Sequence, residues 1–153
     1  MTKAFRILAF LVAALVMVQA ASMVWAVAGL GIWVEEGNDF TSELMESEET
    51  PFTEVAGFMI HGMNGMMLIP LVALILLIVG LIAKFPGSTK YGAAVFLLVV
   101  LQVALGLFGH EAAIFGALHG LNALILFGTA LMAGMRAKDV PVVHDDGRPL
   151  VNA

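Results

Sequence analysis

The chain has 153 residues, of which 61% are hydrophobic and only 12% are charged, and its net charge is -5. Soluble domains carry about 25% charged residues, so this composition excludes an ordinary soluble enzyme and indicates an integral membrane protein. The absence of cysteine excludes disulfides, thiolate metal sites and cysteine nucleophiles. The few Lys and Arg residues are scattered, so no basic surface for nucleic acid is expected.

Four apolar segments follow one another along the chain, at about 4–34, 52–83, 91–108 and 112–135. Each is close to or above the ~20 residues that a helix needs to cross a hydrocarbon core of ~30 Å. The first segment begins like a signal peptide, but its apolar character continues to Trp33, which predicts a retained helix. We therefore predict an all-α integral membrane four-helix bundle over residues 1–138, followed by a polar tail at 139–153.

The positive charges predict the orientation of these helices. All seven Lys and Arg residues fall on one side of the predicted membrane: Lys3, Arg6, Lys84, Lys90, Arg136, Lys138 and Arg148. The positive-inside rule makes that side cytoplasmic, so both termini and the tail are expected inside a plasma membrane. The connection at 35–51 is acidic and is expected outside, as a solvated surface or a docking face for a basic partner. Short connections at 84–90 and 109–111 make neighbouring helices antiparallel.

A polar motif occurs twice in the apolar segments, as "HGMNG" at 61–65 and as "HGLNA" at 119–123. The segments that precede the two copies can also be aligned, which places Gln19 opposite Gln102. We therefore predict that the bundle consists of two copies of one helical hairpin. The two glutamines are expected to form hydrogen bonds across the 4–34 and 91–108 helices.

The repeat predicts that the two histidines lie at the same depth in the membrane. The 52–83 and 112–135 helices would run parallel from the outside to the inside. At about 1.5 Å per residue, His61 and His119 each lie about 14 Å below the outer start of their helix. An ionisable side chain inside a membrane is expensive and usually functional, and here each histidine is the natural partner of the other.

Two neutral imidazoles that face each other in an apolar bundle are what bis-histidine haem ligation requires. Iron takes one ring nitrogen from each side, while the other ring nitrogen needs an orienting hydrogen-bond partner. We predict one haem b per chain, with His61 and His119 as the iron ligands. Neighbouring small residues would leave room for the macrocycle, and neighbouring amides would either support the ligands or form hydrogen bonds between helices. The candidates are Gly57, Gly62, Gly65, Gly116, Gly120, Asn64 and Asn122.

Four membrane helices with histidines on the second and fourth resemble one half of haem A synthase. The resemblance covers residues 4–136 in topology, and at residue level only His61 and His119 carry over. The family is an eight-helix tandem of two such bundles, and its active half has an acidic residue four positions before its first histidine. Gly57 and Phe115 stand at those positions here. The resemblance therefore implies a b-type haem bundle rather than the oxidative chemistry of the synthase.

The predicted function is membrane electron transfer, haem carriage or haem sensing, without substrate chemistry of the protein's own. A first alternative is a non-enzymatic membrane subunit in which His–Asn pairs only pack helices or assemble oligomers. A second alternative is copper transport through soft methionine ligands at Met59, Met63 and Met66. Besides the lipid bilayer, the candidate partners are a second copy, which would rebuild the eight-helix count, and a larger membrane redox complex.

Overall fold

The computed structural model describes residues 1–47, 49–83 and 85–137, and the regular structure within these ranges is entirely helical. The predicted tail at 139–153 lies outside the described residues. The elements are α1 (Thr2–Glu35), α2 (Ser42–Glu46), α3 (Val55–Met63), the π-helix η1 (Asn64–Leu68), α4 (Ile69–Ile82), α5 (Ser88–Phe108) and α6 (Ala113–Arg136).

Four helical segments are long and apolar enough to cross a membrane: α1, the continuous segment Val55–Ile82, α5 and α6. Their outward surfaces carry large apolar side chains, such as Val24 and Leu124, which are 69% and 71% exposed. Such surfaces are stable only against lipid, and a helix satisfies its own backbone groups there. The prediction of an all-helical, multi-pass membrane protein is therefore confirmed.

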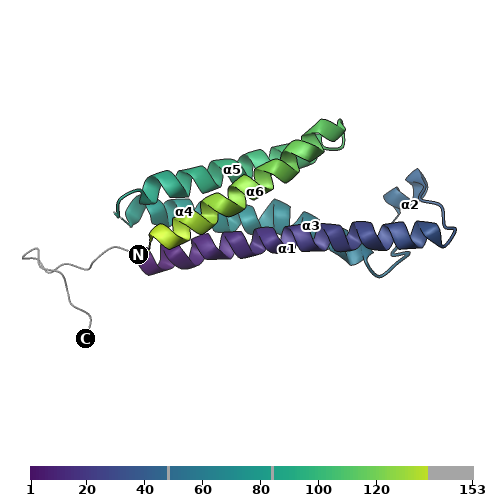
Figure 1. Cartoon of the computed structure of the whole chain (residues 1–153), viewed down its shortest axis with the longest axis horizontal. Helices are drawn as coiled ribbons and strands as arrows, with labels where there is room; N and C mark the ends of the chain where they lie inside the picture. Colours follow the sequence, from purple (N-terminus) through teal and green to yellow (C-terminus); the bar gives the residue numbers. More distant parts are fainter. Residues whose placement is uncertain (48, 84, 138–153) are drawn as a thin grey trace, which may run out of the picture.

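The four spans pack tightly at one end of the molecule and diverge at the other. α1 contacts α3, α4 and α6, while α5 contacts α4 and α6. The apolar core, which includes Phe5, Leu76, Val95 and Leu126, lies in the half that contains the N-terminus. Beyond Val99 on α5 and before Asn122 on α6 no residue is buried. In Figure 1 the α5–α6 pair leans away from α1 and α3 toward the far end. A cavity lies between the two pairs, and we call this region the wedge.

Charged residues gather at the two ends of the spans. The described cations lie where α1 and α5 begin and α6 ends, at Lys3, Arg6, Lys90 and Arg136. The acidic residues that the structure describes end or follow α1, or precede α3 and α6, at the end where the wedge opens. The wedge therefore lies toward the acidic end of the molecule.

The second span is interrupted in its middle by the π-helix η1. Pro70 follows in the first turn of α4, and its ring nitrogen cannot donate the hydrogen bond that a regular helix requires. A π-helical turn is a common way to absorb such a defect, and these turns are frequent at functional sites. The expectation of one uniform helix over 52–83 was thus too simple, and Pro70 was the available signal.

Gly57 allows α3 to approach α1 closely. A Cβ atom at this position would collide with the backbone carbonyl oxygen of Ser22, while one at Gly62 would meet nothing within 4 Å. We expect Gly57→Ala to lower the free energy of unfolding by about 1–3 kcal/mol, because the helix backbones must separate. Gly62→Ala should change it by less than about 0.5 kcal/mol. Thermal unfolding in detergent, followed by circular dichroism, measures both, and equal stability of the two variants would contradict the assigned contact.

Candidate functional site

In the first hairpin the HGxN motif holds a glutamine of α1. The Asn64 side-chain amide donates to the Leu15 carbonyl and to Gln19 Oε1, in both cases at 3.1 Å. The ring Nδ1 of His61 lies 3.1 Å from the backbone carbonyl oxygen of Gln19. The Ser22 hydroxyl donates to the same carbonyl at 3.2 Å. The motif therefore joins α3 and η1 to two turns of α1 through side-chain hydrogen bonds.

The second hairpin repeats this arrangement residue by residue. The Asn122 amide donates to the Leu98 carbonyl at 3.0 Å and to Gln102 Oε1 at 2.6 Å. His119 Nδ1 lies 3.0 Å from the Gln102 carbonyl oxygen. The expected interhelix hydrogen bonds of the two asparagines are thus present. The prediction that the two glutamines form hydrogen bonds between α1 and α5 is wrong, because the side chain of each glutamine bonds to the asparagine of its own hairpin.

The hydrogen bonds also determine which nitrogen of each imidazole is available. A backbone carbonyl can only accept, so Nδ1 must carry the hydrogen in both His61 and His119. In the neutral ring, Nε2 then keeps its lone pair. Among the described residues neither Nε2 has a hydrogen-bond partner. Both rings are therefore oriented by a backbone group and have a free nitrogen ligand, as metal-binding histidines usually do.

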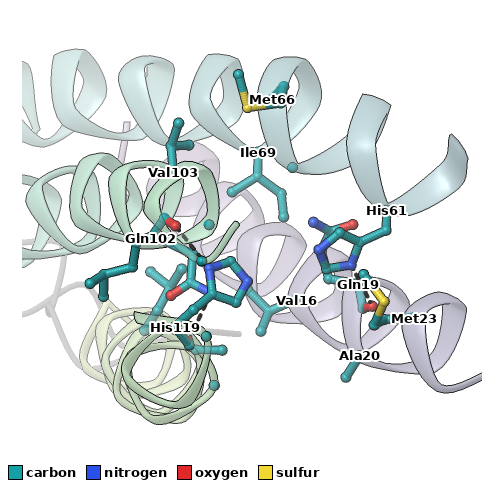
Figure 2. A pocket seen from close by; sticks show the side chains of 18 of the residues that line it. Val16, Gln19, Ala20, Met23, His61, Met66, Ile69, Gln102, Val103 and His119 are labelled. Atoms are coloured by element: carbon teal, nitrogen blue, oxygen red, sulfur yellow. Dashed lines mark hydrogen bonds between the residues drawn. The ribbon is translucent and has the colours of Figure 1, made fainter. Parts of the chain in front are cut away.

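The two imidazoles approach each other from different hairpins. Their ring centroids are 6.1 Å apart and the ring planes are inclined by 48°. Figure 2 shows His61 on one side of a cavity and His119 on the other, with both rings pointing inward. The expectation that the fold brings the two histidines together is met in the structure, although His61 and His119 are 58 positions apart in the sequence.

The cavity between the hairpins has a volume of about 600 Å³ and is lined by α1, α3, η1, α4, α5 and α6. This volume lies within the range of about 300–1,000 Å³ that is typical of cofactor and ligand sites. Most of the lining is aliphatic, and no Lys, Arg, Asp or Glu of the described residues contributes to it. The polar lining side chains are Gln19, His61, Gln102, His110 and His119.

Four of the five glycines that were predicted to clear space for a cofactor line the cavity, and one does not. Gly62, Gly116 and Gly120 line the cavity, and a Cβ atom on any of them would meet nothing within 4 Å. Gly65 also lines the cavity, but the side-chain amide of Gln19 occupies the space beside it. Gly57 does not line the cavity and lies against α1 instead.

Sequence reasoning missed Gly106, which lies beside the His119 ring. A Cβ atom here would approach the ring atoms Cε1 and Nδ1 to 3.1 and 3.2 Å. Gly106 follows Gln102 by four residues, so it occupies the same face of α5 one turn later. That spacing was the signal that could have identified it.

Conventional metal centres and the copper alternative find little support at this site. The described residues contain no group of three or more His, Cys, Asp or Glu side chains that could hold an ion. Met59 and Met63 are exposed on the outer surface and do not line the cavity, whereas Met66 does. A stacked methionine pair therefore does not reach the cavity. Two opposed histidines are enough only for a metal that brings its other donors with it, as the iron of a porphyrin would.

Comparison of the chain with protein-family models, curated proteins and solved structures finds no match. The functional argument consequently rests on the geometry of the cavity and its two histidines.

Proposed function

We propose that this chain is a membrane b-type haem protein in which His61 and His119 ligate the iron from opposite sides. The observation that carries the proposal is the pair of free Nε2 atoms on rings whose centroids are 6.1 Å apart. A metal–nitrogen bond of about 2.0 Å and a ring radius of about 1.1 Å place two axial imidazoles about 6 Å apart between centroids. The separation supports a single metal between the rings.

The surroundings of the two ligands suit a flat apolar macrocycle. The lining is aliphatic, and Gly62, Gly116 and Gly120 leave space on both flanks of the cavity. The carbonyls of Gln19 and Gln102 fix the ring orientations and raise the basicity of the ligating nitrogens. The haem would supply one-electron redox chemistry, and these residues would hold and insulate it.

Ligation of the haem iron by one histidine on each side favours electron transfer, haem carriage or haem sensing over catalysis. With both axial positions filled, no position is left for a substrate. The matching hydrogen bonds of the two hairpins support a duplicated unit, and the resemblance to one half of haem A synthase points to the same kind of bundle. Under the positive-inside rule the cationic end faces the cytoplasm, so the haem lies toward the outer side of a plasma membrane.

Absorption spectra of the purified full chain, oxidised and then reduced, test this proposal. We expect a Soret band and the sharp α band of a six-coordinate low-spin b-type haem, because both axial ligands are neutral imidazoles. Extraction of the pigment should give one haem b per chain. A colourless protein from haem-sufficient cells that also fails to bind added haemin would contradict the proposal.

The alternative of a purely structural subunit makes a different prediction about hydrogen bonding. It requires each histidine to be satisfied by an asparagine. In the described residues, however, Asn64 and Asn122 bond to glutamines and backbone carbonyls. Each histidine uses only Nδ1, so helix packing accounts for the asparagines but leaves the two free Nε2 atoms unexplained.

A further inference from the structure

The two histidines are carried by helices of different regularity. His119 lies on α6, which is a regular α-helix from Ala113 to Arg136. His61 lies three residues before the π-helix η1, and Pro70 follows η1. A π-helical turn has wider hydrogen bonds and is a common place for a helix to bend. The two ligands are therefore not equivalent, although their hydrogen bonds to α1 and α5 match.

His119 is held more firmly than His61. The backbone carbonyl of Gln102 accepts from the ring Nδ1 of His119, and the Gln102 side-chain Nε2 donates to the His119 backbone carbonyl, each at 3.0 Å. Gly106 lets α5 lie directly against this ring. Among the described residues His61 has only the bond to the Gln19 carbonyl. At the position of α1 that corresponds to Gly106 stands Met23, a flexible side chain that can move aside.

A polar group without a partner also lies on the His61 side of the cavity. Gln19 Oε1 accepts from Asn64, but no described residue accepts a hydrogen bond from Gln19 Nε2, which lies beside Gly65. The adjacent Asn64 Oδ1 is buried and has no donor. Buried polar groups are normally paired, so the hydrogen-bond network on this side is incomplete. A donor in a haem pocket decides whether a small ligand is bound there.

We propose that His61 is the displaceable ligand, and that a neutral diatomic molecule such as carbon monoxide binds on its face with Gln19 Nε2 as the donor. The inference rests on the proposed haem. His61 moves away with η1 as the hinge, and His119 keeps its place. The exchange replaces one neutral two-electron donor with another, so the iron keeps its oxidation state and no proton is transferred. This site would give the protein a gas-binding function.

Carbon monoxide binding to the dithionite-reduced, haem-loaded full chain tests the role of η1. The observed rate should reach a ceiling as the carbon monoxide concentration rises, because His61 must leave first. Deletion of Met67, which is 68% exposed, removes one residue from η1 and should restore a regular α-helix with His61 on the same face. We expect the ceiling to fall at least about ten-fold, which corresponds to about 1.4 kcal/mol. The matched control Met67→Leu keeps the chain length and should keep the wild-type rate.

The infrared stretching band of bound carbon monoxide tests the role of Gln19. A donor to the bound molecule weakens the C–O bond, so Gln19→Leu should move the band to higher frequency and weaken binding about five-fold, as the loss of one hydrogen bond would. Met23→Leu is the control on the same face of α1, because Met23 also lines the cavity, four residues after Gln19, but carries no hydrogen-bond donor. It exchanges one apolar side chain for another of similar volume, so it should leave the band in place.

The outcomes separate this inference from the proposed function. If the wild-type chain binds no haem, the proposed function fails. If it binds low-spin haem but no carbon monoxide, or if the band moves in Met23→Leu and not in Gln19→Leu, only the displaceable ligand is overturned. An unchanged ceiling after deletion of Met67, with a wild-type ferrous spectrum, also overturns it. If that deletion variant loses haem, the infrared bands of Gln19→Leu and Met23→Leu decide.

Discussion

Replacing either His61 or His119 with alanine is expected to abolish the low-spin haem spectrum. Low-spin six-coordination needs one Nε2 from each side, and the two rings are the only described imidazoles that face each other across the cavity. His61→Ala should retain haem as a high-spin species held by His119, and His119→Ala should retain less. Absorption and magnetic circular dichroism spectra report the spin state, and the haem-to-protein ratio reports retention.

His110→Ala is the matched control for these two variants. His110 also lines the cavity, but it lies in the turn between α5 and α6 and is exposed. Its removal should leave the low-spin spectrum intact. A wild-type spectrum in His61→Ala or in His119→Ala would contradict the assignment of that histidine as a ligand. Loss of the low-spin spectrum in His110→Ala would contradict the assignment as well, because it would make His110 a ligand.

The membrane spans were predictable because their length and apolar character are enough to identify them. The least exact boundaries were the starts of the second span and of α5, which begin at Val55 instead of 52 and at Ser88 instead of 91. Gly87 adopts a left-handed conformation with φ of 88°, and this residue ends the turn. The turn sequence contained that signal, because a glycine after a proline commonly marks such a position.

The partners of the polar side chains were harder to predict. The repeat identified His61, His119 and the two asparagines, because identical spacing appears twice in the sequence. Which helix each glutamine faces depends on how the helices rotate against one another, and an apolar segment in lipid has little periodicity to reveal this. For the same reason Gly57 and Gly62 looked alike beside His61, although one meets α1 and the other the cavity.

Each hairpin is a self-contained arm that carries one of the two histidines. The described side-chain hydrogen bonds of His61 and Asn64 run to α1, and those of His119 and Asn122 run to α5. The arms meet in the packed half (Figure 1), while both histidines line the cavity between them. The orientation of each imidazole is thus set within its arm, and the spacing between the two imidazoles is set by how far the arms diverge.

Filling the wedge from either arm is expected to prevent haem binding without unfolding the protein. Gly62 on α3 and Gly120 on α6 both line the cavity, and both have open space where a side chain would begin. In Gly62→Leu and Gly120→Leu the new side chain occupies the volume beside the ligand ring. Expelling it would cost about 1–3 kcal/mol, so haem affinity should fall about ten-fold or more. Haemin titration followed at the Soret band measures the affinity.

Gly128→Leu is the matched control for the wedge, because it adds the same side chain and lies on the same helix as Gly120. Gly128 also has nothing within 4 Å of its Cβ position, but it does not line the cavity. Its haem affinity and its thermal unfolding should match those of the wild-type chain. If Gly62→Leu and Gly120→Leu bind haem as well as Gly128→Leu does, the haem lies elsewhere and the opposed histidines serve another purpose. If they lose haem while their circular dichroism spectra and unfolding temperatures stay unchanged, the cavity between the two arms is where the haem binds.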